Sequence, residues 1–135
     1  MIGILLVTHA PLGQAFIQAV SHVFRACPER IEAIDVVADQ DTSQVRAMAS
    51  EAISRLDDGS GVLVITDIIG GTPAMCSLPL CQPGHVEIIA GISLPMLLRA
   101  LTYRQDNIEV VMEMALAGGQ SGAQRIDNRL RVGPH

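Results

Sequence analysis

A histidine and an aspartate each follow an apolar run that has the length of a buried strand. His9 follows the run at 2–8, and Asp67 comes just after the run at 62–65. The carboxyl ends of neighbouring parallel strands meet at one edge of a sheet, which is where open α/β sheets bind their ligands. We therefore expect His9 and Asp67, although far apart in sequence, to lie side by side at this edge.

The two side chains have complementary chemistry. If Asp67 accepts one ring N–H of His9, the other ring nitrogen keeps its lone pair and can act as a nucleophile. The carboxylate would also stabilise the cationic ring that forms when this nitrogen is phosphorylated. The pair predicts a covalent phosphate carrier, because phosphoryl transfer asks a protein mainly for positioning and charge stabilisation. Taken singly, a histidine after a strand is more often a loop residue than a nucleophile, and Asp67 alone could simply cap the following helix.

A glycine-rich turn follows the second apolar run. Gly70 and Gly71 allow a positive φ and let backbone N–H groups approach an anion closely. Thr72 adds a hydroxyl, and Pro73 suits the first turn of a helix whose N-terminal dipole favours a bound phosphate. We expect Gly70, Gly71 and Thr72 to bind the phosphoryl group. Each feature is common alone, so the prediction depends on their combination beside His9.

Strand-like and helix-like segments alternate along the chain, a pattern typical of βαβ units and a parallel sheet. The expected strands cover about 2–8, 31–37, 61–66 and 86–90. The first and third are wholly apolar and belong in the centre, whereas Glu32 and Asp35 suit the second to a sheet edge. The predicted fold is α/β, with an open, mostly parallel sheet in the flavodoxin-like order 2-1-3-4 and helices on both faces.

Five helices are expected between and after the strands. The first follows Pro11, and its apolar face is expected to hold Leu12, Ala15, Phe16, Ala19 and Val23. The others begin near residues 42, 73, 94 and 107. The last is expected to end near residue 117, because the glycines at 118, 119 and 122 interrupt the helical pattern, and a final short element is expected near 123–130.

Composition limits the possible class of protein. The 135 residues are 49% hydrophobic and 17% charged, which predicts one domain that buries some surface against a second subunit. No apolar stretch approaches the ~18 residues that span a bilayer, and the N-terminal run lacks the basic flank of a signal peptide. We expect a cytoplasmic protein without direct membrane insertion. A net charge of −5 with no lysine argues against nucleic acid as a partner.

The three cysteines form no recognisable metal or disulfide pattern. Cys27, Cys76 and Cys81 are an odd set without a C-x-x-C pair and without matching histidine pairs. We expect them to be buried structural thiols and expect no metal site.

Three segments, in this order, resemble the IIA domain of the mannose-type (mannose/fructose/sorbose) sugar phosphotransferase system. They are Ile4-Leu-Leu-Val-Thr-His9, Asp67-Ile-Ile-Gly-Gly-Thr-Pro73 and Ile89-Ala-Gly-Ile-Ser-Leu-Pro-Met96. The resemblance covers a domain at 1–130, followed by a C-terminal tail at 131–135. It implies a phosphotransferase that accepts a phosphoryl group from phospho-HPr on Nε2 of His9 and passes it to a IIB component. Asp67 would orient His9, the groups of Gly70, Gly71 and Thr72 would hold the phosphate, and no cofactor is implied.

The resemblance also implies a homodimer in which a C-terminal strand is exchanged between subunits, here the segment at 123–130. Some relatives carry a tryptophan directly before the Gly-Gly pair, where this chain has Ile69, so the surface that meets a partner is expected to differ. No IIB domain and no Ala/Pro-rich linker follows within the sequence. Sugar uptake through a separate IIB component and regulation through the phosphorylation state therefore both remain open.

Other functions fit fewer residues. The phosphotransfer subunit of dihydroxyacetone kinase also places a histidine after its first strand, but its loop after the third strand reads more like D-L-G-S than the one here. A small metal chelatase resembling the sirohydrochlorin cobaltochelatases needs a second metal-binding histidine, and His22 and His85 are poorly placed for this. A nucleotide-binding Rossmann enzyme lacks its G-x-G-x-x-G turn. An interaction module remains possible if His9 is inert.

Overall fold

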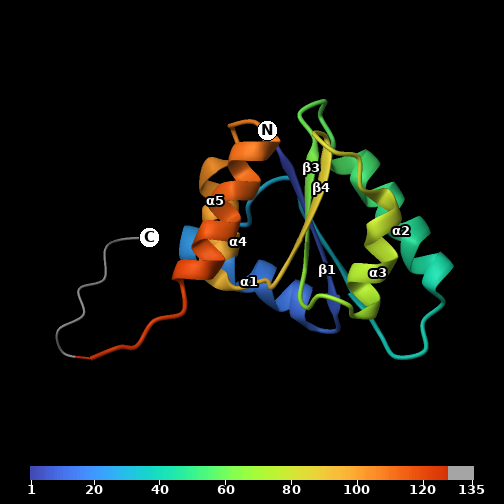
Figure 1. The fold of residues 1–135 in the computed structure, drawn as a ribbon, viewed down its shortest axis with the longest axis horizontal. Helices are drawn as coiled ribbons and strands as arrows, with labels where there is room; N and C mark the ends of the chain where they lie inside the picture. The colour runs from blue at the N-terminus through green and yellow to red at the C-terminus, as the bar shows by residue number, and fades with distance from the viewer. Residues whose placement is uncertain (128–135) are drawn as a thin grey trace.

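The computed structural model describes residues 1–127 and shows a four-stranded parallel sheet between two layers of helices (Figure 1). The strand order is β2-β1-β3-β4, as predicted. The strands are β1 (Gly3–His9), β2 (Ile31–Val36), β3 (Val62–Thr66) and β4 (Val86–Ala90). Two of the strands, β1 and β3, are central and buried on both faces, which explains their continuous apolar sequences.

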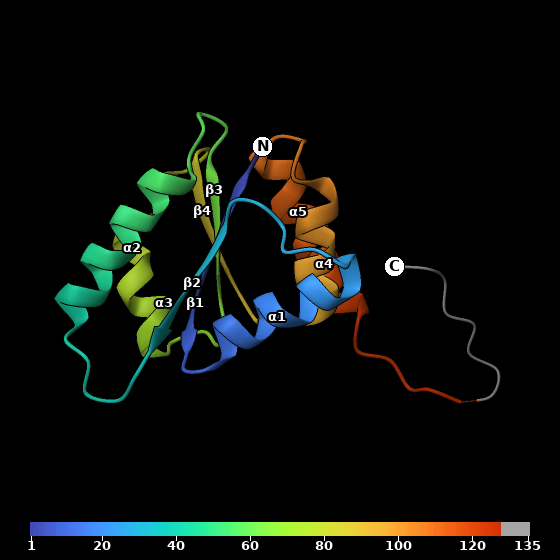
Figure 2. The same cartoon turned by 180° about the vertical axis from the view of Figure 1, so that it is seen from behind.

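Helices cover both faces of the sheet, as Figures 1 and 2 show from opposite sides. One layer holds α1 (Leu12–Phe24), α4 (Leu94–Tyr103) and α5 (Ile108–Ser121). The other holds α2 (Thr42–Leu56) and α3 (Thr72–Ser77), and α3 continues into a single 3₁₀ turn, η1 (Leu78–Leu80). None of the helices formed by residues 1–127 is long and apolar enough to cross a bilayer.

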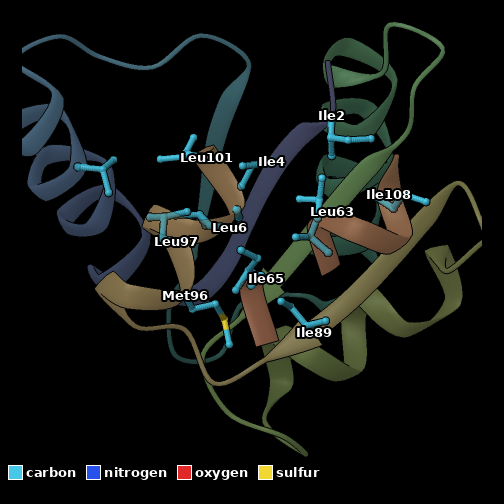
Figure 3. Packing of buried hydrophobic residues seen from close by; sticks show 14 residues of the cluster. Ile2, Ile4, Leu6, Leu63, Ile65, Ile89, Met96, Leu97, Leu101 and Ile108 are labelled. Atoms are coloured by element: carbon cyan, nitrogen blue, oxygen red, sulfur yellow. The ribbon is translucent and has the colours of Figure 1, made fainter. Parts of the chain in front are cut away.

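Side chains of the central strands divide between two cores, because successive strand residues point to opposite faces. Ile4, Leu6, Leu63 and Ile65 pack toward α1, α4 and α5, where they meet Leu97 (Figure 3). Each of these residues is fully buried, and burying one such side chain contributes about 1.5–3 kcal/mol. The two cores hold the carboxyl ends of β1 and β3 in a fixed position.

A buried arginine ties three chain segments together at the opposite end of the sheet. Arg104, only 6% exposed, donates to the backbone carbonyls of Ile2, Glu29 and Arg30 at 2.6–3.0 Å. Burial lowers the pKa of its guanidinium, but four hydrogen bonds satisfy the group. Arg104 therefore acts in folding and lies away from the expected site.

The predicted apolar face of α1 was only partly right, because Phe16 packs against the core as predicted but the two ends of the predicted stripe do not. Leu12 and Val23 are 41% and 46% exposed, whereas Gly13 and Val20 are buried. The stripe that faces the sheet runs through Gly13, Phe16 and Val20 and has the same helical spacing as the predicted stripe. A glycine carries no apolar side chain, so the pattern gave no sign that Gly13 marks the packed face.

The predicted end of α5 was also wrong. The helix continues through Gly118 and Gly119 to Ser121. A Cβ atom on Gly118 would lie 2.6 Å from Cγ of Arg99 and 2.7 Å from the carbonyl oxygen of Pro95. The glycine therefore lets α4 and α5 pack closely, and this packing outweighs its poor helix propensity.

Two other expectations have mixed outcomes. Residues 123–127 form no regular secondary structure, and residues 128–130 of the expected last element lie outside the described residues, so the exchanged strand is not shown. Among the cysteines, Cys76 is buried as expected, but Cys27 is exposed and Cys81 is intermediate.

Candidate functional site

The site lies at the carboxyl edge of the sheet, where the topology brings together the ends of β1 and β3. His9 is the last residue of β1, and Asp67 directly follows the last residue of β3. The register pairs Val7 with Thr66, so the two strands end almost level. The sequence prediction that His9 and Asp67 meet at this edge is confirmed.

Asp67 holds His9 through two hydrogen bonds to one carboxylate oxygen. Its Oδ2 accepts the backbone N–H of His9 at 2.8 Å and lies 2.8 Å from the ring atom Nδ1. The side chain of Asp67 is only 8% exposed, whereas that of His9 is 52% exposed. The carboxylate is thus held in place, and the imidazole is open to a partner.

The protonation state of the pair follows from the surroundings of Asp67. Burial alone would raise the pKa of this carboxyl, but the hydrogen bonds from the backbone and ring of His9, with the ring's charge, outweigh burial and lower the pKa. An ionised carboxylate only accepts hydrogen bonds, so Nδ1 of His9 must carry the proton. In the neutral ring, Nε2 is then left with its lone pair.

Asp67 does not cap the following helix, which was the alternative prediction. The N-cap of α3 is Gly71, which offers no side chain, and Asp67 accepts instead from His9 and from the backbone N–H of Ile68 at 3.0 Å. The carboxylate therefore hydrogen-bonds to the histidine and to the loop that follows β3.

The predicted glycine turn lies against the histidine ring. Gly70 has a φ of 82°, a conformation that L side chains rarely adopt. A Cβ atom on Gly71 would approach Cε1 of His9 to 3.2 Å and Cγ2 of Ile68 to 2.9 Å. The imidazole therefore lies against the backbone of Gly71, and His9 and Thr72 line the same hollow, at the turn where the sequence predicted phosphate contacts.

A second carboxylate anchors the turn that carries His9 and was missed by the sequence reasoning. Oδ1 of Asp35, on β2, accepts the backbone N–H of Gly13 at 3.0 Å and the hydroxyl of Thr8 at 3.3 Å. A Cβ on Gly13 would lie 2.7 Å from the same oxygen. Asp35 was assigned only to an edge strand, although its pairing with Thr8, directly before His9, follows from the predicted order.

His9 lines a hollow on the protein surface, and the sequence analysis did not predict the residues on its other side. A cavity of about 600 Å³ is lined by His9, Thr72, Thr42 and the β2–α2 loop at 36–40. A second hollow of about 280 Å³ lies beyond the two threonines and includes Arg46 of α2. The segment after β2 carries no motif, but β2 neighbours β1 and ends at the same edge, and this topology was the signal that could have identified it.

Exposed apolar side chains follow Asp67 along the chain, on the β3 side of the site. Ile68, Ile69, Met75 and Leu78, from the β3–α3 loop, α3 and η1, are 58%, 85%, 55% and 59% exposed. Ile69 holds the position before the Gly-Gly pair and is the most exposed of these side chains. Exposed apolar side chains next to a polar centre are typical of a surface that binds another protein.

Another His–Asp pair provides a comparison. Nε2 of His85 lies 2.5 Å from Oδ2 of Asp57. The pair lies where β3 and β4 begin, so it is at the opposite edge from His9. Oδ1 of Asp57 accepts the backbone N–H groups of Gly59 and Gly61, which indicates a role in holding this turn. No group of three His, Cys, Asp or Glu side chains able to hold a metal ion occurs within residues 1–127.

A family model and the curated relatives assign this chain to the same protein family. The model of the mannose-type EIIA family, described as "PTS system fructose IIA component", matches residues 3–116. The chain is 28% identical over 101 residues to the "PTS system mannose-specific EIIAB component" of Escherichia coli K12, an alignment that covers 73% of this chain and 31% of the relative. The chain thus spans about a third of the length of the curated relatives it matches.

Solved structures share the fold. An EIIA component of the phosphotransferase system from Streptococcus agalactiae aligns with a TM-score of 0.82 and 22% identity, covering 93% of this chain and 97% of that chain. A mannose/sorbose-specific IIA subunit from Enterococcus faecalis aligns with a TM-score of 0.80 and 19% identity, covering 97% and 98%. At these identities the structural likeness concerns the fold, and the family match stands on the sequence.

Proposed function

The chain belongs to the mannose/fructose/sorbose family of IIA components, which are phosphocarriers of the sugar phosphotransferase system, and we propose that His9 is its phosphorylated residue. The observation that carries this proposal is the hydrogen bond between Nδ1 of His9 and Asp67. It leaves Nε2 as the reactive nitrogen on an exposed ring that lies against Gly71.

The step is an exchange of one P–N bond for another. Nε2 of His9 attacks the phosphorus of a phosphohistidine on the donor, and the donor's P–N bond breaks with its electron pair returning to the donor ring. The proton on Nδ1 of His9 stays in place, where the Asp67 carboxylate stabilises the positive charge that the ring acquires. The backbone N–H groups of Gly70 and Thr72 and the Thr72 hydroxyl stabilise the phosphoryl oxygens, whereas the N–H of Gly71 donates to the carbonyl of Ile68 at 3.4 Å. The reverse exchange delivers the group to the acceptor.

The donor we propose is phospho-HPr, and the acceptor is a IIB component that serves sugar uptake. Both partners must place a phosphoryl group on the same Nε2 or remove it from there, so they must bind the same surface in turn. The exposed apolar side chains on the β3 side of the site suit such binding. A regulatory target that reads the phosphorylation state would use the same surface, and uptake of the label by a IIB component separates the two roles. The chain works in the cytoplasm under this proposal.

We also propose that the protein is a homodimer with an exchanged strand from the segment at 123–130. β4 lies at the edge of the sheet, and no described strand pairs with its outer side. Such an edge is a template for a further strand. Ile126 is 82% exposed in the single chain, so a partner subunit would remove an exposed isoleucine from water.

Phosphoryl uptake from a labelled donor tests the proposal. The protein is incubated with enzyme I, HPr and labelled phosphoenolpyruvate, and the label on the chain is followed with time. We expect acid-labile label on the wild type and on His85→Ala, and none on His9→Ala. His85→Ala is the matched control, because it breaks the other His–Asp pair, at the opposite edge of the sheet. Equal labelling of His9→Ala and wild type would refute the assignment of His9.

A further inference from the structure

An arginine that no sequence motif identified lies next to the site. Arg46, on α2, lines the second hollow together with Thr42, Gly70 and Thr72. Its side chain is exposed, and its guanidinium makes no hydrogen bond or ion pair with any residue from 1 to 127. The next arginine along α2, Arg55, is by contrast held by Glu32 at 2.8 Å. Within the described part of the chain, Arg46 is therefore a cation that forms no structural contact through its charge.

The charge around His9 makes this cation significant. A phosphoryl group adds about −1.5 to −2 charges near neutral pH, and here it would form beside the ionised Asp67. Asp39 adds a further carboxylate to the lining of the first hollow. Arg46 is the only arginine among the described residues that line the two hollows, and the chain contains no lysine. Without Arg46, only backbone N–H groups and hydroxyls would be left to offset the negative charge that the phosphoryl group adds.

The geometry connects Arg46 to the position of the phosphate. Thr42 and Thr72 line both hollows, so the two spaces adjoin across these side chains. Cε1 of His9, the ring carbon bonded to Nε2, would lie 3.2 Å from a Cβ atom on Gly71, directly before Thr72. A phosphoryl group on Nε2 would thus lie at the boundary between the hollows, with Arg46 on its far side. A guanidinium keeps its charge and can donate two hydrogen bonds to a phosphoryl group.

We propose that Arg46 is a catalytic residue that binds the phosphoryl group during its transfer to and from His9. This inference rests on the proposed phosphocarrier function and adds to it a side chain from α2, on the wall opposite the glycine turn. The predicted role is contact with the phosphoryl oxygens themselves and not with the donor protein.

A small phosphoryl donor separates these two roles. Phosphoramidate transfers its phosphoryl group to histidine as its own P–N bond breaks and ammonia leaves, and it makes no protein contact. The rate of His9 phosphorylation by phosphoramidate is measured by mass spectrometry for wild type, Arg46→Ala, Arg46→Lys and Arg55→Ala. Arg55→Ala removes the same charge from the same helix. The same four proteins are then tested with phospho-HPr, and circular dichroism verifies that each is folded.

With both donors we expect Arg46→Ala to react roughly tenfold more slowly, as for the loss of a charge-assisted hydrogen bond. Arg46→Lys should recover part of the rate, and Arg55→Ala should match the wild type. A defect with phospho-HPr alone would overturn the inference and assign Arg46 to donor binding. Equal rates for Arg46→Ala and Arg55→Ala with both donors would also overturn it, while leaving the function of His9 intact. A wild type that reacts with neither donor would refute the proposed function and this inference with it.

Discussion

The ring atom Nδ1 of His9 and the backbone N–H of the same residue both lie 2.8 Å from one carboxylate oxygen of Asp67. This arrangement fixes both the position of the histidine backbone and the orientation of its ring. The ring cannot rotate without breaking a hydrogen bond to a nearly buried carboxylate. Nε2 is consequently the nitrogen that meets a partner.

Replacing Asp67 with asparagine should slow phosphoryl transfer strongly without abolishing it. The amide retains the size of the side chain but lacks the negative charge that stabilises the cationic phosphohistidine ring. We expect a reduction of about ten- to a hundredfold in the uptake rate, equivalent to one hydrogen bond to a charged group. Rapid-quench measurement of label uptake from phospho-HPr gives the rate.

The matched control for this change is Asp57→Asn, which alters the other His–Asp pair and leaves the site intact. Its uptake rate should equal that of the wild type. Unchanged transfer in Asp67→Asn would show that Asp67 only holds the loop after β3.

Replacing Gly71 with alanine should impair transfer while the protein remains folded. The φ of −74° at Gly71 suits any residue, so the backbone tolerates the change. The added Cβ would lie 3.2 Å from Cε1 of His9 and would displace the ring from the position that Asp67 sets. We expect label uptake to fall about tenfold or more, since small displacements of reacting groups are costly.

Gly119→Ala is the control for added volume, because its Cβ would meet only the flexible end of Met96. Uptake should be unchanged in this variant, and the melting temperature should change little in both. Wild-type uptake rates in Gly71→Ala would show that phosphoryl transfer does not depend on the position of the His9 ring against Gly71.

The N-cap of α2 gives a pH-dependent stability. Oδ1 of Asp41 accepts from the hydroxyl and the backbone N–H of Ser43, and these hydrogen bonds lower the pKa of the carboxyl below its ordinary value of 3.8. A lowered pKa stabilises the fold at pH values above 3.8, and this contribution is lost as the pH falls through the folded-state pKa. Asp41→Ala should therefore lower the urea midpoint at neutral pH, and the deficit should shrink below pH 3.8.

Asp41→Asn keeps a capping side chain without a carboxyl that titrates, so it should retain most of the stability at neutral pH. Urea denaturation followed by circular dichroism between neutral and acidic pH measures all three proteins. An Asp41→Ala deficit of constant size over this range would contradict the assigned cause of the shift.

Truncation after Gly122 tests the proposed dimer. The cut leaves α5 complete, because the helix ends at Ser121, and removes the segment proposed to be exchanged between subunits. We expect light scattering to give a dimeric mass for the full chain and a lower mass for the truncated chain at the same concentration. The contrary result is an undiminished dimer, which would exclude a role for this segment in association.

Much of the site could be predicted because its residues lie where apolar strands end. The uninterrupted apolar sequences of β1 and β3 predicted two central strands, and two adjacent parallel strands bring His9 and Asp67 to one edge. The glycine turn was recognisable for the same reason, since it directly follows β3. For His9, Asp67 and the glycine turn, both the local sequence and the strand order predict a position at the carboxyl edge of the sheet.

The missed features depend on packing that leaves no periodic pattern. Gly13 and Gly118 mark close helix contacts, but a glycine reads as a break in an apolar stripe. Arg46 and Asp35 belong to a helix and a strand that carry no motif, and their importance arises only from what lies opposite them. Asp35 could have been recognised by comparing β2 with the neighbouring end of β1, and Arg46 by following the chain from the end of β2 into α2.

Locating the phosphate tests most directly whether His9 is the phosphorylated residue. The protein is phosphorylated by phospho-HPr, digested at neutral or alkaline pH to preserve phosphohistidine, and analysed by mass spectrometry; NMR of the intact protein assigns the nitrogen. We expect a single phosphoryl group, on Nε2 of His9. Phosphate on His85 or another residue, or no phosphate when HPr itself is charged, would contradict it.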